Sequence, residues 1–138
     1  MGDNAELVDL VLPCELSAAR SVRDALRASP GLESMLDEVM LVASELVTNA
    51  VVHSGADERH CLSVVVSRSN SAVLISVRDP GLSADEAKIR AGRGSEVAGR
   101  GLMLVERLSN RWGTQRNGSY LVWAQLEQAP QPPRRPPS

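Results

Sequence analysis

The sequence has very few aromatic residues: phenylalanine is absent, and two tryptophans and one tyrosine are its only such rings. Proteins that read RNA on a sheet surface stack the bases on aromatic rings, so we do not expect this class. Basic residues are not in excess either, because 15 Lys and Arg stand against 17 Asp and Glu. A DNA-binding surface needs a basic face. We therefore expect no direct contact with nucleic acid.

Cysteine clusters and long apolar runs are also missing. Cys14 and Cys61 stand far apart without a CxxC partner, which favours reduced thiols over a zinc site or a disulfide framework. No run of about 18 apolar residues is long enough to span a membrane, and the polar start MGDNAE lacks the layout of a signal peptide. Glu6 stands where N-myristoylation requires Ser or Thr. We expect a cytoplasmic protein that does not bind membranes.

The chain has 138 residues, 43% of them apolar, which is the length and composition of a single domain. We expect a flexible N-terminus over 1–6, the domain over 7–127, and a disordered or polyproline tail over 128–138. The tail reads QAPQPPRRPPS, and its prolines and two arginines cannot form a core. A purely solvated tail and a tail that touches a partner both remain open.

Hydrophobic periodicity and turn residues predict the regular elements. They are a strand at Leu7–Leu12, a helix capped by Ser17 and running to about Ala28, a long amphipathic helix from Leu32 to about Ser54, a hairpin of Leu62–Ser67 and Ala72–Val77, a short helix with a capping box at Ser83 and Glu86, a helix from Gly101 to about Asn110, and a second hairpin with its turn at Asn117–Gly118. This order favours an α+β two-layer sandwich, in which a mixed, mostly antiparallel sheet has its helices on one face. Doubly wound nucleotide-binding folds alternate strands and helices instead.

Polar side chains interrupt the long predicted helix at VASELVTNAVVHS, residues 42–54. Glu45 and Asn49 are four residues apart, so a helix places them on one face, and His53 continues the row. One Asn carbonyl together with phosphate oxygens is a sufficient set of ligands for Mg²⁺, which keeps most of its waters. A carboxylate one turn away can then take a proton from an attacking hydroxyl or water. Taken alone, the row also fits the solvent edge of a core helix.

Two further segments carry candidate chemistry. Asp79 ends an apolar strand before Pro80-Gly81, where it can form an Asx turn or accept a hydrogen bond from the exocyclic amine of adenine. The stretch GRGSEVAGRGL brings Gly99 and Gly101 close to a predicted helix start, where backbone N–H groups can bind phosphate. It lacks the Lys and the Ser or Thr of a P-loop and completes no GxGxxG pattern. A flexible surface loop is therefore the alternative.

In this order, the three segments resemble the motifs of the GHKL ATPase superfamily, which has the Bergerat ATP-binding fold and includes gyrase-type ATPases and histidine kinases. Residues 45–50 (ELVTNA) resemble its N box, 79–81 (DPG) its adenine-recognising G1 box, and 99–102 (GRGL) its phosphate-binding G2 box. The likeness spans roughly residues 7 to 126. It is closest to the anti-sigma-factor serine/threonine kinases and related stand-alone regulatory proteins of the actinobacterial type. Ser83 departs from the fuller DxGxG pattern, which has a second glycine there.

The resemblance implies a role for each matching residue. It implies catalytic roles for Glu45 and Arg100, a magnesium ligand in Asn49, and ATP contacts from Asn49, Asp79, Gly81, Gly99, Arg100, Gly101 and Leu102. In this assignment Glu45 is the base, Asp79 binds the adenine amine, and Arg100 counters charge on the transferred phosphoryl group. The loop from Gly81 to Ala98 would be a lid over ATP.

The same resemblance implies an ATP- and Mg²⁺-dependent serine/threonine kinase that acts in transcription regulation. It would phosphorylate an anti-anti-sigma protein, sequester a sigma factor and form a homodimer. The main alternative is a regulatory module of the same fold that binds ATP, or only its partner, without phosphotransfer. Simple ATP hydrolysis also remains open. A detached histidine-kinase catalytic domain fits less well, because the sequence shows no dimerisation helix with a phosphoacceptor histidine.

Overall fold

A computed structural model of the chain describes residues 4–82 and 96–128, with only the backbone described over 96–101. The elements within these ranges are β1 (Ala5–Pro13), α1 (Ser17–Arg27), α2 (Leu36–His53), β2 (Cys61–Ser69), β3 (Ala72–Asp79), α4 (Glu96–Leu108), β4 (Arg111–Arg116) and β5 (Tyr120–Glu127). The predicted short helix after Ser83 and most of the predicted tail lie outside these residues. None of the described helices is both long and apolar enough to cross a membrane.

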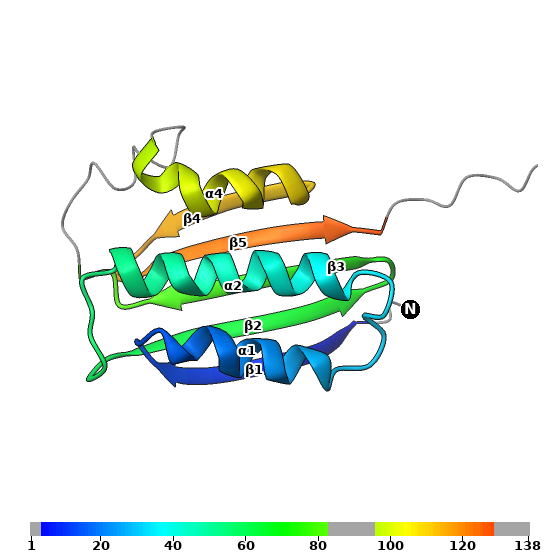
Figure 1. The fold of residues 1–138 in the computed structure, drawn as a ribbon, viewed down its shortest axis with the longest axis horizontal. Coiled ribbons are helices and arrows are strands. Elements are labelled where there is room, and N and C mark those ends of the chain that lie inside the picture. Colours follow the sequence, from blue (N-terminus) through cyan, green and yellow to red (C-terminus); the bar gives the residue numbers. More distant parts are fainter. Residues whose placement is uncertain (1–3, 83–95, 129–138) are drawn as a thin grey trace, which may run out of the picture.

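The five described strands form one sheet in the order β1-β2-β3-β5-β4, and all four neighbouring pairs are antiparallel (Figure 1). The β2–β3 hairpin turns through Asn70 and Ser71, with Asn70 at φ 56°, a left-handed conformation that asparagine tolerates. β5 lies between β3 and β4. This order pairs Asp79, at the end of β3, with Tyr120, at the start of β5.

The described helices all lie on one face of the sheet (Figure 1). Alternate strand residues point toward them and are buried, as the period of a strand requires. The buried strand residues include Leu62, Val64, Val66, Val73, Ile75, Val77, Val122, Ala124 and Leu126. The helices contribute Val22, Leu26, Val39, Val42, Leu46, Val47 and Val105. A core of Val, Leu and Ala thus forms without phenylalanine, and the expected two-layer α+β fold is confirmed.

The first strand and the first helix begin differently from the prediction. β1 begins at Ala5, inside the segment that was predicted to be a flexible N-terminus. Leu16 occupies the N-cap of α1, so the prediction that Ser17 caps this helix is wrong. Instead, the hydroxyl of Ser17 donates a hydrogen bond to the carboxylate of Glu15 (Oγ–Oε2 2.8 Å).

The other two helices begin at shifted positions. α2 begins at Leu36 rather than Leu32, because the N–H of Met35 bonds the carbonyl of Leu32 in a preceding turn (2.8 Å). α4 begins at Glu96, before the predicted start at Gly101. Glu and Ala favour helices, and glycine costs only about 1 kcal/mol inside one, so the glycines do not stop the helix. Gly99 and Gly101 therefore lie within the first turns of α4.

Candidate functional site

The three segments with candidate chemistry lie at one end of the molecule. α2 and β3 run in the same direction, so the C-terminal half of α2 and Asp79 lie at the same end, where α4 also begins (Figure 1). α2 packs against both β3 and α4. The fold therefore brings the C-terminal half of α2, the end of β3 and the start of α4, which are far apart in the sequence, to one end of the molecule.

Glu45 and Asn49 lie one turn apart on α2, and both side chains are half-buried. The opposite face of the helix anchors it, because Leu46, Val47 and Ala50 are buried in the core. Within the described part of the chain, neither Glu45 nor Asn49 has a side-chain hydrogen bond or an ion pair. A carboxylate and an amide in this state can offer their oxygens to a ligand.

Asp79 is buried at the end of β3, with 3% of its surface exposed. Its Oδ1 accepts a hydrogen bond from the N–H of Gly81 at 2.7 Å, so the Asx turn considered for this position is present. The turn does not exclude ligand binding, because a carboxylate has two oxygens with about four acceptor sites. The Asx turn thus fixes the orientation of the Asp79 carboxylate.

Gly81 lies in a position that only glycine can occupy without strain. Its φ is +66°, and an added Cβ would come within 3.1 Å of the backbone N of Tyr120 and 3.2 Å of Nη1 of Arg116. The carbonyl oxygen of Gly81 accepts a hydrogen bond from that same Nη1 at 3.3 Å. The turn after β3 therefore packs closely against the β4–β5 hairpin, and its glycine allows this approach.

Tyr120 lies directly beneath this turn, in register with Asp79. The pKa of its hydroxyl is raised, mainly by burial and also by the nearby Asp79 carboxylate. A hydrogen bond with Thr114 and the Arg116 guanidinium act in the opposite direction and lower the pKa. Sequence reasoning missed both Tyr120 and Arg116. No motif marks either residue, and only the placement of β5 beside β3 brings them to Asp79.

The structure describes the backbone of the glycine segment from Glu96 to Gly101 but not its side chains. Gly99 and Gly101 are the fourth and sixth residues of α4. Only the first four backbone N–H groups of a helix lack partners within it and can bind an anion, so Gly101 lies beyond that set. The side chain of Arg100 and the predicted lid lie outside the described residues. Leu102 is buried in the core, with 4% of its surface exposed, so its side chain anchors α4. The ligand contacts assigned to these residues stay predictions.

Comparison with known proteins agrees with this fold. Two solved structures, each with a TM-score of 0.62, are similar to it: the RsbU and RsbW domains of Rv1364c from Mycobacterium tuberculosis, at 22% identity, and the SiaB–SiaC complex from Pseudomonas aeruginosa, at 17%. The matches cover 87% and 88% of this chain, and 32% and 89% of the respective relatives. The chain thus spans about a third of the mycobacterial chain. No curated protein sequence matches it.

A family model accounts for most of the sequence. Residues 12–124 match the histidine kinase-like ATPase domain, and this range includes Glu45, Asn49, Asp79 and the glycine segment. The resemblance read from the short motifs therefore extends over nearly the whole fold. The chain belongs to the histidine kinase-like ATPase domain family.

Proposed function

We propose that the chain binds Mg-ATP and transfers the γ-phosphoryl group to a serine or threonine hydroxyl of a partner protein. The observation that carries this proposal is the pair Glu45 and Asn49, half-buried and without polar partners among the described residues, in the half of α2 that runs toward the end of β3 and Asp79. Membership of an ATPase family supports ATP as the nucleotide. The pair would supply a base and a metal ligand one helical turn apart.

In the proposed step, Glu45 takes the proton of the attacking hydroxyl as the hydroxyl oxygen bonds to the γ-phosphorus. The bond between that phosphorus and the β,γ-bridging oxygen breaks, and ADP leaves with the electron pair. The products are ADP and a phosphoserine or phosphothreonine. Arg100 would counter the charge on the transferred group, because its planar guanidinium matches phosphate oxygens.

Asn49 fits a magnesium ion by the chemistry of its donor, because Mg²⁺ prefers oxygen ligands. Among the residues that the structure describes, no group of three or more His, Cys, Asp or Glu is arranged to hold a metal. Phosphate oxygens and water would therefore provide the other ligands, as is usual for Mg²⁺ bound with a nucleotide. The ion would neutralise part of the phosphate charge.

The proposed partner is a protein. One structural neighbour contains an RsbW domain, and the other was solved as a complex of SiaB with SiaC. Together with the likeness of the motifs to anti-sigma-factor kinases, this supports an anti-anti-sigma protein as the phosphoacceptor and a sigma factor as a second partner. We also propose a homodimer on the same basis.

The test is to incubate the chain with Mg²⁺, ATP labelled in its γ-phosphate and candidate anti-anti-sigma proteins, and to detect phosphoserine and phosphothreonine. We expect label on the partner only when Mg²⁺ is present. Wild-type protein that binds ATP and partner but transfers no label would instead be a regulatory binding module. Release of free phosphate without labelling of the partner would show an ATPase.

Glu45→Gln tests the proposed base. This variant should bind ATP with unchanged affinity and transfer phosphate at least about 100-fold more slowly, because general-base catalysis contributes on this scale. Asp37→Asn is the matched control, since Asp37 is an exposed carboxylate in the first turn of the same helix. Equal transfer rates for Glu45→Gln and wild type would remove Glu45 from the mechanism.

A further inference from the structure

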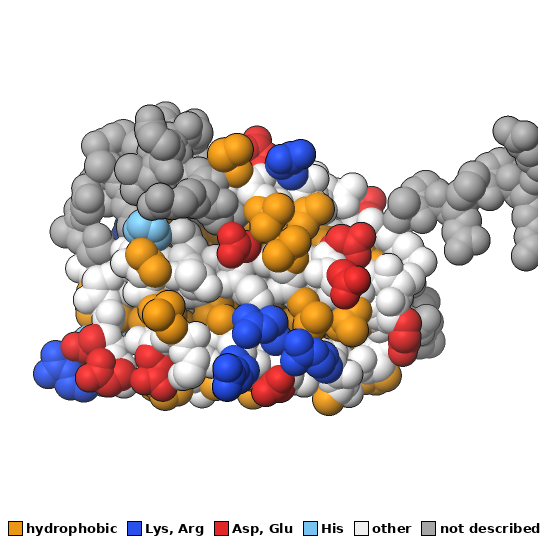
Figure 2. All heavy atoms as spheres, viewed as in Figure 1, with side chains coloured by type: hydrophobic (Ala, Val, Ile, Leu, Met, Phe, Trp, Pro, Cys, Tyr) orange, Lys and Arg blue, Asp and Glu red, His pale blue; other side chains and the backbone are white. Residues whose placement is uncertain are grey.

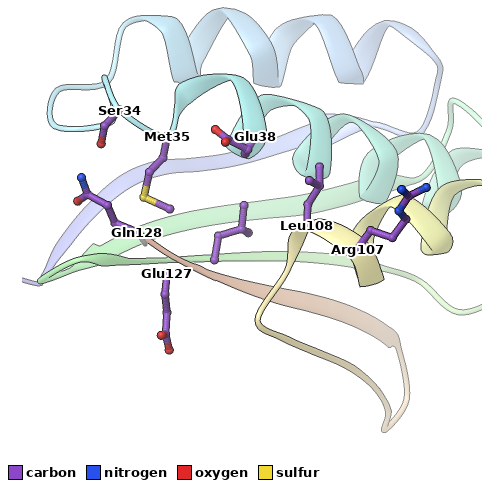
Figure 3. A pocket seen from close by; sticks show the side chains of 8 residues that line it. Ser34, Met35, Glu38, Arg107, Leu108, Glu127 and Gln128 are labelled. Atoms are coloured by element: carbon purple, nitrogen blue, oxygen red, sulfur yellow. The ribbon is translucent and has the colours of Figure 1, made fainter. Parts of the chain in front are cut away.

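A hollow of about 380 Å³ lies at the N-terminal end of α2, away from the end of β3 that carries Asp79. The segment before α2, the end of α4 and the end of β5 enclose it (Figure 3). Met35, Leu108 and Leu126 form its apolar floor. We call it the rear hollow. Its volume falls in the lower part of the range of about 300 to 1,000 Å³ that ligand pockets span, so a short peptide segment can fill it.

The rim of the rear hollow carries charges that are not paired. Glu38 of α2 and Arg107 of α4 both line the hollow, but neither makes an ion pair or a hydrogen bond within the described residues. Glu127 also lines the hollow, but its side chain points away from it (Figure 3), so the acidic groups at the rim are Glu38 and the adjoining Asp37. Figure 2 shows apolar side chains between α2 and α4, with acidic side chains beside them. This surface suits an apolar segment that carries positive charge.

Such a segment begins at the rim itself. Gln128 lines the rear hollow, and its N–H donates a hydrogen bond to the carbonyl oxygen of Ser71 (2.7 Å), which fixes where the chain leaves the sheet. Residues 129–138 read APQPPRRPPS, with five prolines, two arginines and no acidic side chain. A polyproline stretch rises about 3.1 Å per residue, so Ala129–Pro133 can span about 15 Å.

We infer that residues 129–138 bind in the rear hollow of their own chain. The prolines pack on Met35, Leu108 and Leu126, and Arg134 or Arg135 pairs with Glu38. Proline suits this role because its fixed φ reduces the conformational entropy lost on binding, and methionine adapts its shape to the surface it meets. The inference concerns the end of the molecule away from Asp79 and does not depend on phosphotransfer.

Methionine methyl groups provide the test. Of the four methionines in the chain, Met35 lines the hollow, whereas Met103 is exposed on α4 and does not line it. NMR spectra of the full chain labelled at methionine methyl groups are compared for wild type and R134E/R135E. We expect the Met35 resonance, assigned with Met35→Leu, to move, while that of Met103 stays in place. Glu38→Lys added to R134E/R135E should return the Met35 resonance toward its wild-type position.

Three outcomes would overturn the inference. One is a Met35 resonance that is the same in wild type and R134E/R135E. The second is a difference that depends on protein concentration, since the tail of a second copy would then occupy the hollow. The third concerns Glu33→Lys, a change at an exposed position that does not line the hollow. If this change, added to R134E/R135E, returned the Met35 resonance as far as Glu38→Lys does, the effect would reflect overall charge rather than pairing with Glu38.

Discussion

The guanidinium carbon of Arg116, at the end of β4, lies 5.2 Å from the centroid of the Tyr120 ring. The same guanidinium donates a hydrogen bond to the carbonyl oxygen of Gly81 (3.3 Å). Arg116 therefore ties the turn that follows Asp79 to the first residue of β5. Because Asp79 is the proposed acceptor for adenine, we expect Arg116 to position this turn for nucleotide recognition.

Arg116→Ala should weaken ATP binding about 3- to 10-fold, because a hydrogen bond and a cation–π contact are each worth about 0.5 to 1.5 kcal/mol. The rate of phosphotransfer at saturating ATP should be unchanged. Titration calorimetry with Mg-ATP measures the affinity, and Arg111→Ala, an exposed arginine at the other end of β4, is the control. Equal affinities for Arg116→Ala and wild type would leave Arg116 without this role.

Gly81→Ala and Gly118→Ala separate backbone strain from close packing. Both glycines have positive φ, +66° and +78°, but a Cβ at Gly81 would meet backbone atoms of the β4–β5 turn, and a Cβ at Gly118 would meet nothing within 4 Å. Gly118→Ala should cost about 1 to 2 kcal/mol of unfolding free energy from strain alone. Gly81→Ala should cost more and also weaken ATP binding. Chemical denaturation measures the unfolding free energy of both variants. Equal losses of unfolding free energy in Gly81→Ala and Gly118→Ala would contradict the packing argument.

Asp79→Asn tests the adenine acceptor. An amide oxygen can still accept the hydrogen bond of Gly81, but the second oxygen is replaced by an NH₂ group, which cannot accept one from the adenine amine. We expect ATP affinity to fall at least about 10-fold, the usual effect of losing a hydrogen bond to a charged group. Asp79→Ala should also destabilise the fold, since the Asx turn is lost. Unchanged ATP affinity in Asp79→Asn would remove Asp79 from the site.

Tyr120 makes the stability of the fold sensitive to alkali. Its folded-state pKa is raised, mainly by burial, above the ordinary value of about 10. Tyr120 therefore ionises at lower pH in the unfolded chain than in the folded one. Its contribution to the free energy of unfolding is fully present below about pH 10 and is lost as pH rises through the folded-state pKa. Tyr120 is the only tyrosine in the chain, so tyrosinate absorbance reports it alone. Tyr120→Phe should lose less unfolding free energy than wild type as the pH is raised above about 10. An identical loss in the two proteins would contradict this prediction.

Ser54 closes α2 just beyond Asn49. It is fully buried, and its hydroxyl oxygen accepts the N–H of Ala56 (3.1 Å) and lies 3.6 Å from Sγ of Cys14. Ser54→Ala leaves that N–H without its partner and should cost about 1 to 3 kcal/mol. Ser44→Ala removes only a long contact with Arg23 (3.4 Å) and should cost less than Ser54→Ala. Denaturant unfolding compares the two variants.

The elements that the sequence predicted well are those marked by a pattern of residues close together in the chain. Alternating apolar residues predict β2 and β3, and spacing of three and four predicts α2, because both periods follow directly from backbone geometry. The boundaries were less accurate. Ser17 resembles a helix cap but bonds Glu15 instead, and the glycines before Leu102 did not prevent α4 from starting at Glu96.

The site was only partly predictable, because some of its residues are defined by tertiary contacts. Glu45 and Asn49 could be recognised, since one helical turn sets their spacing. Arg116 and Tyr120 could not, because their contact with Gly81 depends on β5 pairing with β3 rather than on any local motif. The rear hollow was equally hidden, since three separate segments form it.

α2 has 18 residues, so at 1.5 Å per residue it is a rod about 27 Å long. Glu38, near one end of this rod, lines the rear hollow, and Glu45 and Asn49 lie in the half that reaches the candidate nucleotide site. A helix resists bending within its length, so a small tilt imposed at one end moves the other end in the opposite sense. As a single stiff element, α2 thus forms part of both the rear hollow and the candidate nucleotide site.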